Sequence, residues 1–365
     1  MIGAMKNKIL FISYLDTSYS RSSVYFNENK NNNFVQIFMK IDLPILSSLK
    51  KLWLMRYLLQ DKLCVIVVMN PCHIFVPFIR FLTSQPIILD AGWPLSDSNS
   101  NSNARLVRIF SSLKNYVVDF LAFKIATRTL MESQSQIDYS AKKFMIPKRK
   151  LIRVFTGFNE NLYNVHTTKL GIGEVQNHLD ILGVISSSKY VFFRGKYTKE
   201  AGLENLALLS RTKLAHVKIV VATNRIPNNL IFGDNVKVIT NFLSELQISA
   251  LYLGSSVCLG QLSHHSRLLR TIPHKAFEAG YFARPYVSLD SKSMRELYPR
   301  NDQAAYLKDS SAKEISSVIL SVINNIPLQR ALSFNVNQQY KKVANQAMLQ
   351  NELSEIATYL LLISE

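Results

Sequence analysis

The sequence predicts two α/β units in series, each built on a parallel β-sheet with helices on both faces. The chain has 365 residues, which is more than one hydrophobic core usually supports. Short apolar and β-branched runs recur along it, and stretches with helical character separate them. The strand pattern weakens after residue 158 and restarts at Tyr190, so the chain divides into two halves.

The predicted strands share a high content of Val, Ile, Leu and Phe between polar or turn-forming residues. They cover residues 8–14, 64–69, 86–90, 151–155, 190–194, 216–222, 236–240, 256–260 and 285–289.

Three other segments complete the predicted organisation. Residues 159–188 have a weak pattern and three glycines, so we expect the interdomain linker there. The Asn- and Ser-rich stretches 27–33 and 96–103 read as loops, and residues 339–365 read as a helix.

The chain carries a formal charge of +18, and most of the excess lies in residues 1–170. Such an excess attracts nucleic acid, anionic membranes or anionic small molecules without choosing among them. Because the basic residues form no recognisable nucleic-acid-binding module, we expect no nucleic-acid partner. The densest cluster is either a solvated face or a contact for an anionic membrane surface or phosphate-bearing acceptor, and comprises Lys142, Lys143, Lys148, Arg149 and Lys150.

The few cysteines and histidines predict neither disulfides nor a metal site. The three cysteines, Cys64, Cys72 and Cys258, form no CxxC pair, so a reducing compartment fits best. His264 and His265 are adjacent instead of being spaced as metal ligands are.

No apolar run approaches the roughly 18 residues that a membrane span needs. The apolar stretch 9–15 ends at Asp16 with no cleavage site after it, so it reads as a buried strand instead of a secretory signal. We therefore expect a cytoplasmic protein, peripheral at most on the inner face of the membrane.

The most informative segment is residues 267–289, RLLRTIPHKAFEAGYFARPYVSL. Pro273 suits the first turn of a helix, and we expect a short helix over residues 273–283. The amino end of that helix would attract a diphosphate, and Lys275 adds a cation there. Glu278 lies near one helix face with Lys275 and His274, where a carboxylate can accept hydrogen bonds from two ribose hydroxyls. The alternative is a Lys–Glu pair on an exposed helix surface.

This segment resembles the donor-binding segment of retaining GT-B glycosyltransferases of family 4 (glycosyl transferases group 1). In that family a P-x-K-x-x-E-like helix is followed by a small turn, a proline and a strand, and Pro273, Lys275, Glu278 and Pro285 match in order. Upstream, FFRGKYTKEAGLENL resembles the family's strand, Gly-Arg turn and Glu-Lys-Gly segment. Residues 240–260 resemble its next helix and strand, and TGFNENLY resembles the element that closes its acceptor domain.

The resemblance implies two Rossmann-like domains facing a cleft, which is the GT-B fold. Residues 1–170 would bind the acceptor, residues 171–340 would bind a nucleotide-sugar donor, and a helix over residues 341–365 would cross back to the first domain. The implied reaction transfers a sugar from a nucleotide diphosphate sugar to a glycan or lipid-linked acceptor, with retention and without a metal or other cofactor. The implied setting is the biosynthesis of surface polysaccharide or another glycoconjugate.

On this resemblance, the donor-binding residues lie in the loop after the first strand of the second half and around the predicted helix. They are Gly195, Lys196, Lys199, Arg270, Thr271, His274, Lys275 and Glu278.

Two departures from the family pattern bear on catalysis. Many members carry two glutamates eight positions apart, and the earlier position here is Arg270, which cannot act as a carboxylate. The lysine of the Glu-Lys-Gly segment falls on Ala201, although Lys196 can bind a diphosphate and Lys199 can replace the missing cation. The alternatives are therefore a degenerate protein that binds a sugar nucleotide without catalysis, or a basic nucleic-acid-binding protein.

Other nucleotide-binding classes do not fit. A dinucleotide-dependent oxidoreductase needs a glycine-rich turn after the first strand, and residues 12–23 contain no glycine. A P-loop also fails, because no glycine stands at the required position before Gly195 and Lys196.

The catalytic candidates are Asp90 and His73 in the first half, together with Glu278. Asp90 ends a predicted strand and His73 follows another, and ligands of open α/β sheets bind beyond the carboxyl ends of strands. The alternatives are a buried structural histidine at position 73 and a loop cap beside Gly92 at position 90.

Overall fold

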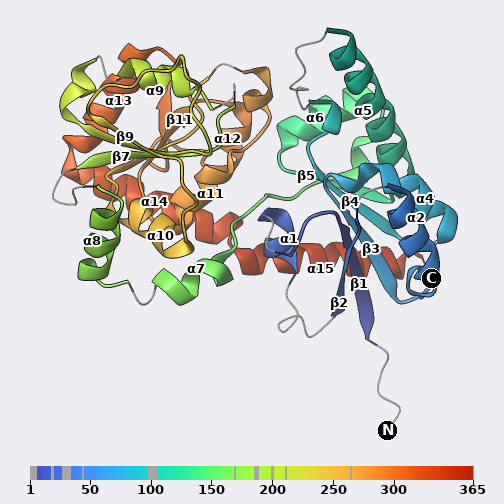
Figure 1. Ribbon diagram of the computed structural model, residues 1–365. Coiled ribbons are helices and arrows are strands. Elements are labelled where there is room, and N and C mark those ends of the chain that lie inside the picture. Colours follow the sequence, from blue (N-terminus) through green and yellow to red (C-terminus); the bar gives the residue numbers. More distant parts are fainter. Residues whose placement is uncertain are drawn as a thin grey trace. The chain divides into compact units, whose positions relative to one another are not determined.

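The computed structural model describes residues 6–17, 20–26, 34–42, 45–97, 105–167, 170–184, 189–198, 201–209, 212–263 and 265–364. The chain forms two compact units (Figure 1). Unit 1 comprises Met1–Thr156 and Gln346–Glu365, and unit 2 comprises Gly157–Asn345.

Unit 1 is built on a parallel six-stranded sheet with the strand order β2-β1-β3-β4-β5-β6. The strands are β1 (Asn7–Ser13), β2 (Phe34–Lys40), β3 (Cys64–Met69), β4 (Ile87–Gly92), β5 (Arg128–Met131) and β6 (Leu151–Arg153). The α-helices are α1 (Ser20–Tyr25), α2 (Ile45–Leu54), α3 (Arg56–Leu59), α4 (Val76–Leu82), α5 (Arg105–Ile125), α6 (Gln134–Phe144) and α15 (Gln346–Leu362). Short 3-10 helices are η1 (Cys72–Phe75), η2 (Leu95–Asp97) and η3 (Lys148–Lys150).

The central strands of unit 1 are mostly apolar because helices cover both faces of the sheet. Every residue of β3, CVIVVM, is buried, as expected for a parallel strand between two helical layers. Leu10, Ile66 and Leu89 belong to one core cluster together with residues of α4 and α5. Helix α15 contacts β3 and α1, and Gln346 Nε2 donates to the carbonyl of Ser23 at 3.1 Å.

Unit 2 is built on a second parallel six-stranded sheet, in the order β12-β11-β10-β7-β8-β9. The strands are β7 (Tyr190–Arg194), β8 (Lys218–Ala222), β9 (Val236–Ile239), β10 (Val257–Leu259), β11 (Tyr286–Leu289) and β12 (Ala305–Leu307). The α-helices are α7 (Glu160–Thr167), α8 (Ile172–Ile181), α9 (Leu203–Leu209), α10 (Glu245–Gly254), α11 (His274–Tyr281), α12 (Lys292–Leu297), α13 (Ala312–Ile323) and α14 (Ile326–Val343). The 3-10 helices are η4 (Lys213–His216) and η5 (Ser266–Leu269).

The strand order of unit 2 creates a switch point between β7 and β10. The chain runs from β7 outward to β8 and β9, then returns to β10 on the other side of β7 and continues to β11 and β12. The loops that follow β7 and β10 therefore leave the sheet in opposite directions. In open α/β sheets this is where ligands bind.

The predicted α/β fold with two parallel sheets is confirmed, and every predicted strand overlaps an observed one. Three strands were not predicted. Strand β2 is an edge strand with a mixed burial pattern, while β5 and β12 have only 4 and 3 residues. Such short or half-exposed runs give little periodic signal.

Several predicted boundaries differ from the observed ones. The predicted linker over residues 159–188 is wrong where the structure describes it, because α7 and α8 occupy the segment and pack on α10 of unit 2. The domain boundary expected at residue 170 therefore falls inside unit 2. The helix expected over residues 339–365 is two helices, separated at Ala344 and Asn345. Residues 27–33 and 98–103 of the expected loops lie outside the described part of the chain.

Candidate functional site

Helix α11 places its charged side chains at the carboxyl ends of β7 and β10. Pro273 is the N-cap, with φ −62° and ψ 135°, so the helix begins at His274 instead of Pro273. Lys275 and Glu278 are 7% and 2% exposed. A Lys–Glu pair on an exposed helix surface is therefore excluded, and both charges belong to the interior of unit 2.

Lys275 is a buried cation at the switch point. Its Nζ lies 3.6 Å from the centroid of the Phe193 ring, at the end of β7, and donates to the Gly260 carbonyl, just beyond β10, at 3.4 Å. Burial lowers the pKa of Lys275 to about 7, and the nearby Glu278 carboxylate only partly opposes this effect. An ammonium with three donors and one long hydrogen bond has capacity for an anionic ligand.

Glu278 is held by three side chains of unit 2. Arg194 Nη1 and the Tyr252 hydroxyl both donate to its carboxylate, and His274 Nδ1 lies 3.2 Å from Oε1. Burial would raise the pKa of Glu278, but the Arg194 charge and the hydrogen bonds from His274 and Tyr252 hold it at about 2. The carboxylate therefore remains ionised, with protein donors on both oxygens.

The loop after β7 approaches Lys275 closely. A Cβ at Gly195 would lie 3.2 Å from Lys275 Nζ, so glycine leaves room for the ammonium. Lys196 follows with an exposed side chain. Asn205 Nδ2 donates to the Leu262 carbonyl at 2.5 Å, which joins the segment after β7 to the segment after β10.

Ala201, where the family pattern has a lysine, is 2% exposed and part of the hydrophobic core, so no cation stands at that position. The other predicted donor-binding residues occupy different environments. Arg270 follows η5 and donates to the Ser266 carbonyl at 3.4 Å. Thr271 is buried and donates to the Arg267 carbonyl at 3.3 Å. Lys199 lies outside the described residues.

In unit 1, Asp90 belongs to a buried polar network at the carboxyl end of the sheet. Arg21 Nε donates to its Oδ2 at 2.9 Å, and Arg21 Nη2 lies 2.5 Å from Oδ1. Arg21 Nη1 also donates to Thr156 Oγ1 at 3.1 Å, and that hydroxyl donates to Glu132 Oε2 at 3.3 Å. Burial raises the pKa of Asp90, although the Arg21 charge opposes this. Asp90 lies within β4, so the loop-cap alternative does not describe it.

His73 is completely buried in η1. Its ring centroid lies 6.0 Å from that of Phe123, and Nε2 lies 3.9 Å from Asp119 Oδ1. Burial lowers the pKa of His73 to about 3, so the ring stays neutral. This environment favours the structural alternative for His73.

The described residues contain no group of three or more His, Cys, Asp or Glu side chains placed to hold a metal ion. None of their helices is long and apolar enough to cross a bilayer.

Solved structures identify the architecture. Sucrose-phosphate synthase from Thermosynechococcus elongatus is similar with a TM-score of 0.72 and 11% identity, over 98% of this chain and 100% of that one. Anabaena Alr3699/HepE in complex with UDP gives a TM-score of 0.70 at 11% identity, over 96% and 100%. The chain has the GT-B fold. UDP-GlcNAc 2-epimerase from Neisseria meningitidis, bound to UDP-GlcNAc, is also similar, with a TM-score of 0.57 at 12% identity, over 96% and 100%.

Comparisons with protein-family models and with curated protein sequences give no match. The GT-B fold confirms the predicted fold class, whereas membership of family 4 stays a prediction. Because a synthase and an epimerase are both similar to this chain, the GT-B fold alone does not fix the reaction.

Sequence reasoning missed three residues that shape these sites. Arg194 and Tyr252 hold Glu278, and Arg21 holds Asp90. Arg194 carried one usable signal, its position as a charged residue at the end of an apolar strand. Tyr252 and Arg21 carried none, since each lies in a short helix distant in sequence from its partner.

Proposed function

We propose that the protein is a glycosyltransferase that uses a nucleotide diphosphate sugar as donor. The observation that carries this proposal is the buried, weakly bonded ammonium of Lys275 at the switch point of unit 2. It stands beside Gly195 and in the first turn of α11, and the amino end of a helix favours an anion. A diphosphate is the part of such a donor that this arrangement suits.

In the proposed reaction, the bond between the anomeric carbon and the diphosphate oxygen breaks, and an acceptor hydroxyl forms the new bond and loses its proton. Lys275, the amino end of α11 and Lys196 would stabilise the charge that develops on the leaving diphosphate. Arg270 is a further cation for that charge. No metal is needed in this scheme, and retention of configuration follows from the family resemblance alone.

We propose different roles for the other candidates. Glu278 would bind the ribose with whatever acceptor capacity Arg194, Tyr252 and His274 leave free, since an ionised carboxylate has about four lone-pair sites. Asp90 would hold the Arg21 side chain in position, because Arg21 forms an ion pair with it and covers it. His73 would have a structural role, because it is completely buried. The acceptor would be a glycan or lipid-linked molecule bound by unit 1.

Donor binding is tested with UDP-, GDP- and ADP-sugars by isothermal titration calorimetry. One nucleotide should bind wild type, and Lys275→Met should weaken it by at least about tenfold, because one charge-assisted contact is lost. Lys341→Met, which removes an exposed lysine of the same unit, should leave the affinity unchanged. Absence of binding by all three donor classes to the folded protein would refute the proposal.

A second candidate function is donor binding without turnover. Two observations favour it: Arg270 stands where the family places a glutamate, and both oxygens of Glu278 already accept protein hydrogen bonds. Product analysis separates the candidates once the donor is known. A glycosylated acceptor supports transfer, a changed sugar with intact nucleotide supports epimerisation, and an unchanged donor supports binding alone.

We further propose that unit 1 rests on an anionic membrane through α5. Five apolar side chains at helical spacing are exposed along one face of this helix: Val107 53%, Phe110 69%, Leu113 59%, Val117 46% and Leu121 42%. The exposed Lys114 and Lys124 lie on or beside that face. An exposed apolar stripe flanked by lysines is typical of helices that lie in a membrane interface.

Vesicle co-sedimentation tests this setting. The protein should sediment with vesicles containing phosphatidylglycerol and much less with pure phosphatidylcholine, because the flanking lysines need anionic headgroups. Phe110→Ser combined with Leu113→Ser should abolish sedimentation. Ile231→Ser combined with Phe242→Ser is the matched control, since both side chains are exposed and apolar but belong to unit 2. Equal sedimentation of all variants would contradict the role of α5.

A further inference from the structure

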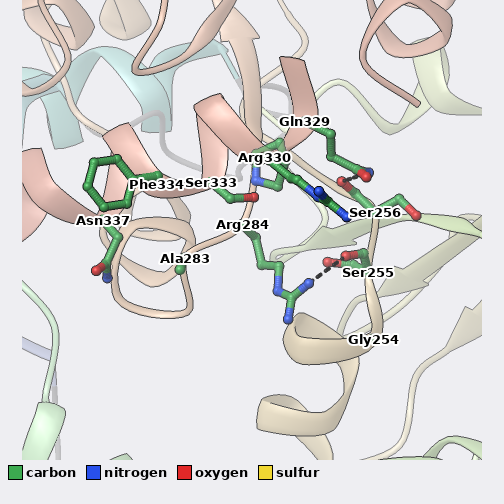
Figure 2. Close-up of a pocket in the computed structure, with 11 residues that line it drawn as sticks. Gly254, Ser255, Ser256, Ala283, Arg284, Gln329, Arg330, Ser333, Phe334 and Asn337 are labelled. Atoms are coloured by element: carbon green, nitrogen blue, oxygen red, sulfur yellow. Dashed lines mark hydrogen bonds between the residues drawn. The ribbon is translucent and has the colours of Figure 1, made fainter. Parts of the chain in front are cut away.

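A cavity of about 500 Å³ lies in unit 2 at the amino-terminal ends of β10 and β11. Its walls are the turn between α10 and β10, the turn between α11 and β11, and residues 329–337 of α14 (Figure 2). Lys275 and Glu278 lie at the other edge of the sheet, where β7 and β10 end. The cavity is therefore separate from the proposed donor site.

Two arginines and no acidic residue line the cavity. Arg284 directly precedes Pro285 and β11, and Arg330 lies in α14. Neither forms an ion pair with a carboxylate within the described part of the protein. In Figure 2 both side chains extend toward the turn at Ser255 and Ser256.

Arg284 is half-buried and incompletely bonded. Its Nη1 donates to the Ser255 carbonyl at 3.4 Å, which is a long hydrogen bond, and its Nε has no partner among the described atoms. Burial lowers the pKa of Arg284, so enclosure disfavours its charge, and nearby Cys258 and Tyr190 only partly oppose this. A buried guanidinium without a counter-ion is stabilised by an anion more than an exposed one is.

The polar side chains of the cavity divide into fixed and available groups. Gln329 Nε2 donates to the Ser256 carbonyl at 2.9 Å, and Asn337 Nδ2 donates to the Gly280 carbonyl at 2.8 Å, so both amides hold the walls together. Ser256 and Ser333 also line the cavity, and the hydroxyl of each can donate to a ligand oxygen. Phe334, 64% exposed, supplies an apolar wall.

We propose that this cavity binds a phosphate monoester of a small polar molecule, such as a sugar phosphate. Guanidinium groups match the geometry of phosphate oxygens, and two of them with no competing carboxylate favour a dianion. The cavity falls in the size range of small-molecule sites, so it also admits the organic part, with Phe334 against one face of it. The site is independent of the proposed glycosyl transfer.

Calorimetry with inorganic phosphate and with glucose 6-phosphate tests the site. Glucose 6-phosphate should bind wild type more tightly than phosphate, and Arg330→Gln should weaken it by about tenfold through loss of a charge-assisted contact. Arg284→Gln should weaken it further. Because Arg330 is exposed, its variant should fold normally even if the Arg284 variant does not.

Two controls separate this cavity from other anion sites. Arg300→Gln removes an exposed arginine of unit 2 that pairs with Asp302, and it should leave glucose 6-phosphate binding unchanged. Lys275→Met should also leave it unchanged, whether or not the protein binds nucleotide sugars. The assignment would be overturned if Arg330→Gln bound glucose 6-phosphate with wild-type affinity or if Lys275→Met lost that binding. It would also be overturned if wild type bound inorganic phosphate as tightly as glucose 6-phosphate.

Discussion

The two buried ionisable side chains of α11 have opposite environments: the surroundings favour the charged form of Glu278 and disfavour the charged form of Lys275. Glu278 receives an arginine and two further hydrogen-bonding side chains, so its pKa falls to about 2. The Lys275 ammonium contacts the Phe193 ring and donates to the Gly260 carbonyl at 3.4 Å, and burial lowers its pKa to about 7. Glu278 is satisfied within the protein, whereas Lys275 gains from a bound anion.

This contrast predicts pH-dependent donor binding. Lys275 is charged below its pKa of about 7 and increasingly neutral above it, and a sugar nucleotide, whose diphosphate is doubly esterified, does not titrate in this range. Affinity should therefore fall by about tenfold between pH 6 and pH 8 as the ammonium loses its proton. Isothermal titration calorimetry at both pH values measures this change.

Two variants test the origin of that pH dependence. Lys275→Met should bind weakly with the same affinity at both pH values. Lys196→Met, which removes an exposed lysine from the neighbouring loop, should keep the pH dependence. A pH-independent wild type would show that Lys275 does not contact the diphosphate.

At the level of elements, the position of α11 depends on its close packing against α14. A Cβ at Gly280 would clash with the Tyr298 hydroxyl and would lie 2.7 Å from the Cβ of Tyr340 in α14. Both tyrosines are buried and cannot move aside freely. Gly280→Ala should therefore lower the free energy of unfolding by about 1–3 kcal/mol, the usual cost of overpacking.

Gly173→Ala is the matched control for Gly280→Ala. Gly173 also lies in a helix, α8, but a Cβ there would meet no atom within 4 Å. This change should be neutral or stabilise by up to about 1 kcal/mol, because alanine favours helix over glycine. Urea denaturation of both variants gives the comparison, and equal effects would argue against the α11–α14 contact.

For the whole molecule, the last helix of the chain completes unit 1. Helix α15 buries a stripe at helical spacing, Leu349, Leu353, Ala357 and Leu360, and contacts α1 and β3. Deleting residues 346–365 should expose that apolar surface, so amide exchange in α1 and β3 should accelerate while the β7–β10 core of unit 2 stays protected.

A shorter deletion provides the control for the α15 experiment. Removing only residues 363–365, which lie beyond the helix, should leave exchange in unit 1 unchanged. Unchanged exchange after the longer deletion would mean that unit 1 is complete without α15. Hydrogen–deuterium exchange with peptide resolution measures both variants.

The sequence by itself determined the fold class, nearly all central strands and the helix that carries Lys275 and Glu278. Local sequence patterns predict these features: apolar runs such as CVIVVM in β3, and the prolines before and after α11. The sequence did not determine which charges would be satisfied. Glu278 meets Arg194 and Tyr252 from positions 84 and 26 residues away, and Asp90 meets Arg21 from 69 residues away. Burial and hydrogen bonding between distant residues depend on how the strands and helices pack, and so only the tertiary structure separated the satisfied Glu278 and the enclosed His73 from the available Lys275.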